Sequence, residues 1–166
     1  MGELTIRPQN RGADIAAIAD INAQVFDGGT PAFHRLRQSP DPDLVSLVAE
    51  RDGEVLGHVF FSPVTIDSTP PVAGMGLGEL AVRQHCQRQG IGAALTRAGL
   101  EALGARGCPF VIVVGVPAYY PRLGFEPGAK HGLRCQWQVP PESFMVYVLD
   151  PAAMAGVTGV ARYRDV

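Results

Sequence analysis

Residue types that bind phosphate groups gather in one short stretch, Gln87-Arg88-Gln89-Gly90-Ile91-Gly92-Ala93. The stretch opens an Ala- and Leu-rich run that predicts a helix. The first four amide N–H groups of a helix lack internal partners, and the helix dipole adds partial positive charge there. Because glycines let a ligand approach these amides closely, we expect the amides from Gln89 to Ala93 to bind a pyrophosphate, with Arg88 adding a full positive charge.

Three common active-site motifs are absent from the sequence. A Walker A loop needs a Gly-Lys pair, which the chain lacks. A dinucleotide fingerprint needs a third glycine where Leu95 stands. No G-x-S-x-G motif marks a nucleophilic serine. The simpler alternative for Gly90 and Gly92 is that they only connect a strand to a helix.

Turn residues and apolar runs predict the elements that position this stretch. Asp52-Gly53, between two β-rich runs, predicts a two-residue hairpin. The apolar run 109–116 predicts a strand buried on both faces. Because a helix over 90–107 joins the strand expected at 75–82 to this run, the two strands should be parallel, and hairpins make the rest antiparallel. The sequence also predicts strands at 3–8, 133–139 and 143–149, helices at 13–26 and 31–38, a loop at 67–74 and a short helical segment at 118–125.

Three details of these elements follow from residue types. Thr30 before Pro31 fits an N-cap followed by the first helical position. The glycines in the strand at 75–82 suggest bulges or a close approach by another backbone. One face of the helix at 13–26 should carry Ile15, Ile18, Ala19, Asn22 and Phe26.

Length and composition favour one soluble globular domain. The chain has 166 residues, of which 46% are hydrophobic and 18% charged. The formal charge of −2 gives no electrostatic case for nucleic acid or a membrane surface, and no apolar run is long enough to span a membrane. Three cysteines without a C-x-x-C pair predict neither a metal site nor a disulfide framework. With no secretory leader recognisable, we expect a cytoplasmic protein.

Two motifs give the chain a family resemblance. Gln87, Gly90, Gly92 and Ala93 form Q-x-x-G-x-G/A, and Tyr120 begins the pattern Y-x-x-x-G-F. Together they resemble the GNAT family of acetyl-CoA-dependent N-acyltransferases. The resemblance implies an α/β fold with a mixed, mostly antiparallel sheet, in which the fourth and fifth strands are parallel and splay apart. It covers residues 3–149, so we expect an acetyltransferase domain over 1–150 and a tail over 151–166 that packs on the domain or on a dimer partner.

The chain departs from the family pattern in two places. The turn from Arg83 to Gln87 has the sequence RQHCQ, where members often have a proline and an aromatic residue. Gly115 and Val116 follow the apolar strand, where many members place a polar residue against the cofactor. Because of the second departure, neither Gly115 nor Val116 offers a polar side chain for this part of the pantetheine contact.

The resemblance implies acetyl-CoA as the acyl donor and no metal. The backbones of Leu80, Ala81 and Val82 would bind the pantetheine amides and the thioester carbonyl as an added strand would. Tyr120 matches the family tyrosine and would protonate the departing thiolate, while its neighbour Tyr119 packs against the sheet.

Glu79 is a candidate general base for the attacking amine. It is the only acidic residue between Asp67 and Glu101. A carboxylate in apolar surroundings, acting through a water, can take the proton of the amine. The alternative is a solvent-facing or salt-bridged glutamate at a strand end.

The expected reaction is transfer of an acetyl group to a primary amine of a small molecule or protein by direct attack on the thioester. The alternative function is a non-catalytic acyl-CoA-binding sensor or regulatory module. Arg35 and Arg37 would suit an anionic group on the acceptor, but we expect them on a solvated helix face. We expect His34 and His58 to be surface or core residues, with a catalytic role as the alternative. The sequence leaves open the acceptor, the acyl-chain length and the choice between monomer and homodimer. Candidates near the acceptor, by position only, are Phe26, Phe33, His34, Arg35, Trp137 and Phe144.

Overall fold

The computed structural model of the protein describes residues 2–164 and 166. The strands are β1 (Thr5–Pro8), β2 (Val45–Arg51), β3 (Glu54–Ile66), β4 (Val72–Val82), β5 (Phe110–Val114), β6 (Glu126–Pro127), β7 (Leu133–Cys135), β8 (Phe144–Val148) and β9 (Gly159–Tyr163). The α-helices are α1 (Ile15–Val25), α2 (Pro31–Arg37), α3 (Ile91–Ala105) and α4 (Pro151–Met154). Short 3-10 helices are η1 (Gln84–Cys86), η2 (Tyr120–Leu123), η3 (Gly128–His131) and η4 (Pro141–Ser143).

Hydrogen bonds join the strands in the order β1-β2-β3-β4-β5-β8-β6, with β9 paired to both β3 and β7. The expected parallel pairing of β4 with β5 is confirmed by the register from Met75↔Val111 to Leu77↔Val113. The expectation that all other pairs are antiparallel is wrong for β7 and β9, which run parallel. The fold is thus the expected mixed, mostly antiparallel α/β fold.

Several element boundaries differ from the sequence prediction. β4 begins at Val72, inside the expected loop 67–74, and the strand expected at 133–139 is only three residues long. The sequence did not predict α4 and β9, which form in the tail 151–166. β9 pairs antiparallel with Val64–Ile66, so a strand partner distant in the sequence fixes its structure. Local patterns do not contain that information.

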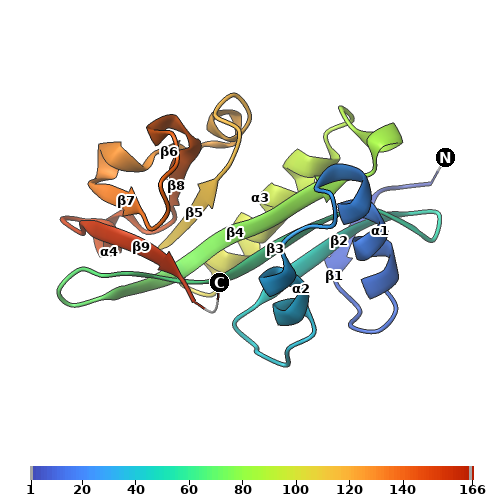
Figure 1. Ribbon diagram of the computed structural model, residues 1–166, viewed down its shortest axis with the longest axis horizontal. Coiled ribbons are helices and arrows are strands. Elements are labelled where there is room, and N and C mark those ends of the chain that lie inside the picture. Colours follow the sequence, from blue (N-terminus) through green and yellow to red (C-terminus); the bar gives the residue numbers. More distant parts are fainter. Residues whose placement is uncertain (1, 165) are drawn as a thin grey trace. The chain divides into compact units, whose positions relative to one another are not determined.

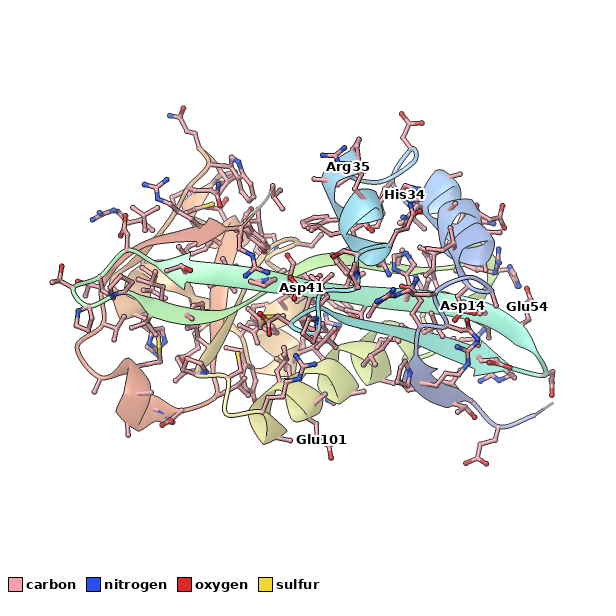
Figure 2. The ribbon with its side chains drawn as sticks, turned by 90° about the horizontal axis from the view of Figure 1, so that it is seen from below. Asp14, His34, Arg35, Asp41, Glu54 and Glu101 are labelled. Atoms are coloured by element: carbon pink, nitrogen blue, oxygen red, sulfur yellow. The ribbon has the colours of Figure 1, made fainter. Side chains whose placement is uncertain are left out.

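The chain forms two compact units. The first comprises the residues up to Phe61 together with Gly78–Gly99, and the second comprises Ser62–Leu77 with the residues from Leu100 onward. In the first unit, β1, β2 and the hairpin-linked β3 pair antiparallel. Figure 2 shows α1 and α2 on one face of these strands and the start of α3 on the other.

The core of the first unit joins α1 to the strands. Ile18 and Ile21 of α1 pack with Val48, Val55 and Ala81. The sequence placed Ala19 and Phe26 on the buried face, but both are exposed. Phe26 has φ −120°, so the helical periodicity ends before it.

In the second unit, β5 pairs with β8 and β8 with β6, all antiparallel (Figure 1). Two glycines of β4 leave room for aromatic rings. A Cβ at Gly74 would lie 2.5 Å from the ring of Phe110, and a Cβ at Gly76 would lie 2.4 Å from the ring of Tyr163. We expected another backbone to approach these glycines, but aromatic rings lie there instead. Tyr163 also donates its hydroxyl to the carbonyl of Leu77 at 2.8 Å.

Gly99→Ala should destabilise the protein although alanine favours a helix. Helix propensity alone predicts a gain of about 1 kcal/mol. A Cβ at Gly99 would, however, lie 2.2 Å from the ring of Phe61 in the core, so we expect a net loss of about 1–3 kcal/mol in the free energy of unfolding in urea. The double variant with Phe61→Leu should lose less than the sum of the two single variants. A more stable Gly99→Ala protein would contradict this packing.

Candidate functional site

The glycine-led turn lies between β4 and α3 in the first unit. Two of its residues have left-handed backbone conformations, Arg88 with φ 65° and Gly90 with φ 83°. The side chain of Gln87 donates to the carbonyl of Val82 at 3.0 Å and so joins the turn to the end of β4. The segment 87–90 is exposed, whereas Ile91 is buried and anchors the helix.

The first turn of α3 has amides without helical partners. Its first helical hydrogen bond runs from the amide of Ala94 to the carbonyl of Gly90 at 3.0 Å. The amides of Ile91, Gly92 and Ala93 therefore have no partner within the helix. A Cβ at Gly90 would meet no atom within 4 Å, so the backbone conformation, rather than crowding, requires glycine there. The predicted phosphate-binding residues thus gather at the start of a fifteen-residue helix.

Leu80, Ala81 and Val82 form the end of β4. Ala81 is buried, and the amide of Arg83 that follows donates to the carbonyl of Leu56 on β3 at 2.8 Å. The register of β4 with β5 covers Met75–Leu77, and β4 continues to Val82.

Glu79 lies just before this segment and is only 4% exposed. Its Oε2 accepts from the amide of Thr30 at 2.9 Å. Its Oε1 accepts from Nδ2 of Asn22 at 3.4 Å and lies 3.5 Å from Nη2 of Arg37. The surroundings of this carboxylate are therefore not the apolar ones expected for a general base, because three donors contact it. The alternative was a solvent-facing or salt-bridged glutamate, and Glu79 is salt-bridged but buried.

Gly29 lies directly against this carboxylate. It has φ +78°, and a Cβ there would lie 2.8 Å from Oε2 of Glu79 and 2.9 Å from Nδ2 of Asn22. Thr30 follows as the N-cap position of α2 with Pro31 at N1, as the sequence predicted. Its amide, and not a side-chain cap, makes the contact with β4.

Arg37 is buried, which corrects its expected place on a solvated helix face. Its side chain, on α2, is 0% exposed. Nη2 contacts Nδ1 of His58 at 2.6 Å, and Nη1 donates to Oγ of Ser46 at 2.6 Å. The guanidinium also lies 4.6 Å from the ring centre of Phe60. The missed signal was the apolar partner at i−4 on the same face, Phe33, which is also buried.

His58 lies in the core, as one of the two expected alternatives. Its Nε2 contacts Oδ1 of Asn22 at 2.7 Å, so the ring connects Arg37 with Asn22. Burial, and then the charge of Arg37, lower the pKa of His58 well below its usual value. Burial also lowers the pKa of Arg37 to about 10, partly offset by Glu79. At pH 7, His58 is therefore neutral and Arg37 charged.

Tyr120 belongs to the second unit, at the start of η2. It is 7% exposed, and its ring meets those of Tyr119 and Phe125 edge to face, at 5.1 and 5.5 Å between ring centres. Burial, followed by the neighbouring Tyr119, raises the pKa of its phenol. The hydroxyl therefore stays protonated and can act as a donor.

Gly115 has a physical role in holding this tyrosine. A Cβ at Gly115 would lie 2.4 Å from Cε2 of Tyr120, so any larger residue would displace the ring. The glycine that departs from the family pattern is thus the residue that lets Tyr120 pack.

The residues named as acceptor candidates differ in exposure. His34 and Arg35 are exposed on α2 (Figure 2), while Phe33 is buried. Trp137 is 41% exposed and stacks on Tyr163, with 5.3 Å between ring centres. The two remaining candidates are Phe26, which is exposed, and Phe144, which is buried.

None of the helices among the described residues is both long and apolar enough to cross a membrane. In the same part of the chain, no group of three or more His, Cys, Asp or Glu side chains could hold a metal ion.

Comparison with known proteins assigns the family. A model of the GNAT acetyltransferase domain matches residues 42–127. A protein of Escherichia coli strain K12, named uncharacterized N-acetyltransferase YhbS, is 34% identical over 139 residues, which cover 84% of this chain and 83% of the relative. This chain therefore belongs to the GNAT family of acetyltransferases, as its motifs implied.

Solved structures agree with this assignment. The crystal structure of the GNAT family N-acetyltransferase YhbS from Escherichia coli in complex with CoA matches with a TM-score of 0.86 and 33% identity, covering 99% of this chain and 91% of that one. A GNAT family acetyltransferase from Brucella melitensis in complex with acetyl-CoA matches with a TM-score of 0.73 and 27% identity, covering 99% and 97% of the two chains. The expected fold is confirmed.

Titration of His58 should make stability depend on pH. The ring is neutral when folded, but the unfolded chain binds a proton as the pH falls below about 6.5. The stabilisation is thus complete above that pH and is lost below it, by up to about 1.4 kcal/mol per pH unit. Urea unfolding from pH 7 to pH 5 should show a smaller loss in His58→Gln than in the wild type. His34→Gln, at an exposed histidine, is the matched control, and equal losses in wild type and His58→Gln would contradict the prediction.

Proposed function

We propose that this protein transfers the acetyl group of acetyl-CoA to a primary amine of a small molecule or protein. The observation that carries the proposal is the open, glycine-led start of α3, together with the likeness to two family members named as complexes with CoA and acetyl-CoA. The cofactor serves as a substrate, and the reaction proceeds by direct attack of the amine on the thioester.

The pyrophosphate of acetyl-CoA binds at the turn from Gln87 to Ala93. The unpaired amides of the first turn of α3 donate to its oxygens, and the helix dipole favours the negative charge. Arg88 is exposed beside these amides and contributes a full positive charge. The left-handed conformation of Gly90 leaves this backbone open to the ligand.

The pantetheine arm pairs with the end of β4 as an added strand. The backbones of Leu80, Ala81 and Val82 bind its amides, which gives affinity without side-chain chemistry. One of these backbone N–H groups points at the thioester oxygen and stabilises the oxyanion that develops there.

Glu79 acts as the general base for the amine. A carboxylate offers about four acceptor positions, and three donors already contact this one, which leaves a position for a bridging water. The proton of the ammonium passes through that water to Glu79. The neutral amine nitrogen then attacks the carbonyl carbon and forms a tetrahedral intermediate.

Tyr120 acts as the general acid. When the carbon–sulfur bond breaks, its hydroxyl gives a proton to the departing thiolate of CoA. The nitrogen of the tetrahedral intermediate still carries one proton more than the amide product, and this proton passes through water to the phenolate and restores Tyr120, while Glu79 releases its proton to solvent. Because burial raises the pKa of the phenol, the hydroxyl is protonated at neutral pH and can donate a hydrogen bond to the sulfur as the negative charge develops there. The products are the acetylated amine and CoA.

Arg88→Glu should weaken the binding of acetyl-CoA. The change replaces an attractive charge at the pyrophosphate by a repulsive one, so calorimetry should give a Kd raised at least about tenfold, or about 1.4 kcal/mol. The salt dependence of binding should also decrease. Arg11→Glu makes the same charge change at an exposed position in the turn before α1 and is the control. Equal affinities for both variants would mean that the pyrophosphate binds elsewhere.

Tyr120→Phe should lower kcat without weakening the binding of acetyl-CoA. Loss of the proton donor should reduce kcat at least about tenfold, because the thiolate then leaves unprotonated. The Kd for acetyl-CoA should change less than about twofold. Tyr119→Phe removes the hydroxyl of the adjacent tyrosine and should keep kcat near the wild-type value. If single-turnover kinetics show slow chemistry and an unchanged kcat in Tyr120→Phe, another group is the acid.

A further inference from the structure

Four buried polar side chains on four different elements form one connected network in the first unit. Asn22 lies on α1, Arg37 on α2, His58 on β3 and Glu79 on β4. None is more than 4% exposed. Buried ion pairs contribute little net stability compared with apolar side chains of similar volume, so the fold alone does not require this arrangement.

The donor chemistry of the four residues allows only one pattern of hydrogen bonds. A guanidinium can only donate, so Nδ1 of His58 accepts from Arg37. Because the ring is neutral, Nε2 then carries the proton and donates to Oδ1 of Asn22. This bond fixes the orientation of the Asn22 amide, and its Nδ2 faces Oε1 of Glu79. The charge of Arg37 thus determines the tautomer of His58 and the direction of the Asn22 amide.

The same contacts hold both oxygens of the carboxylate. Oε1 receives Asn22 and lies near Arg37, while Oε2 receives the amide of Thr30. Since the contacts come from α1, from α2 and from the turn between them, the carboxylate has one orientation relative to the end of β4. The Gly29–Thr30 segment is joined to the same carboxylate.

We propose that Arg37, His58 and Asn22 are positioning residues, which orient the carboxylate of Glu79 so that its remaining acceptor position faces the amine. The proposal rests on the proposed role of Glu79 as the general base. It assigns these residues to proton removal from the acceptor and not to the binding of acetyl-CoA. Their loss should therefore lower kcat and leave the KM for acetyl-CoA unchanged.

A matched pair of variants at His58 separates positioning from a merely structural role. The amide nitrogen of His58→Gln reaches the place of Nε2 and keeps the donor to Asn22. The amide oxygen of His58→Asn takes the place of Nδ1 and keeps only the acceptor for Arg37. We expect His58→Gln to retain kcat within about threefold, and His58→Asn to lose at least about tenfold. Equal losses in the two variants would overturn the proposal.

Asn22→Leu is the second variant, because it removes the amide while keeping a similar volume. It should lower kcat at least about tenfold, with the KM for acetyl-CoA within about twofold of the wild type. Val48→Ala leaves a cavity in the apolar core of the same unit and is the control for lost stability. Below its unfolding temperature, it should keep the wild-type kcat.

Glu79→Gln separates the proposed base role of Glu79 from the proposed positioning role of Arg37, His58 and Asn22. If it keeps the wild-type kcat, the base role of Glu79 fails, and the positioning proposal fails with it. If it loses activity while folded His58→Asn and Asn22→Leu keep theirs, only the positioning proposal is overturned.

A measurement on the wild-type protein keeps the proposal testable if the variants do not fold. Long-range ¹H–¹⁵N spectra report which ring nitrogen of a histidine carries the proton. His58 should be neutral at pH 7, with the proton on Nε2. A proton on Nδ1, or a charged ring at that pH, would contradict the hydrogen-bond pattern.

Discussion

The central constraint on the first unit is that the buried carboxylate of Glu79 needs donors. An unpaired charge in a core is severely destabilising, so the surrounding elements must bring polar groups to it. α1 supplies Asn22, α2 supplies Arg37, and the turn between these helices supplies the amide of Thr30. The two helices and their connection are thereby fixed relative to the end of β4, where the thioester is proposed to bind.

The sequence predicted the parts of the molecule that depend on local patterns. The Asp52-Gly53 hairpin, the N-cap position of Thr30 and the glycine-led start of α3 each follow from short-range backbone preferences. The parallel β4–β5 pair followed from the helix that connects these two strands. The family could be predicted because its motifs lie in such locally determined segments.

The remainder depended on contacts between distant segments. Because Arg37 is charged, the sequence predicted that its side chain faces solvent. Its burial depends on two partners distant in the sequence, His58, which lies 21 residues away, and the carboxylate of Glu79. β9 becomes a strand because β3 and β7 pair with it. No local sequence pattern explains the glycine at position 115. The structure explains it, because the ring of Tyr120 packs against Gly115 and leaves no room for a side chain. The proposed roles of Glu79 and Tyr120 depend in addition on where the substrate binds, which local sequence patterns do not specify.

The most direct test of the account is amine-dependent release of CoA. Purified protein is first shown by calorimetry to bind acetyl-CoA, and release of the free thiol is then followed with a panel of small-molecule amines and lysine-containing peptides. The account predicts that at least one amine increases thiol release above the rate without acceptor and does so saturably, with one acetylated amine formed per thiol. Tight binding of acetyl-CoA without release by any amine would contradict acetyl transfer and would favour an acyl-CoA sensor.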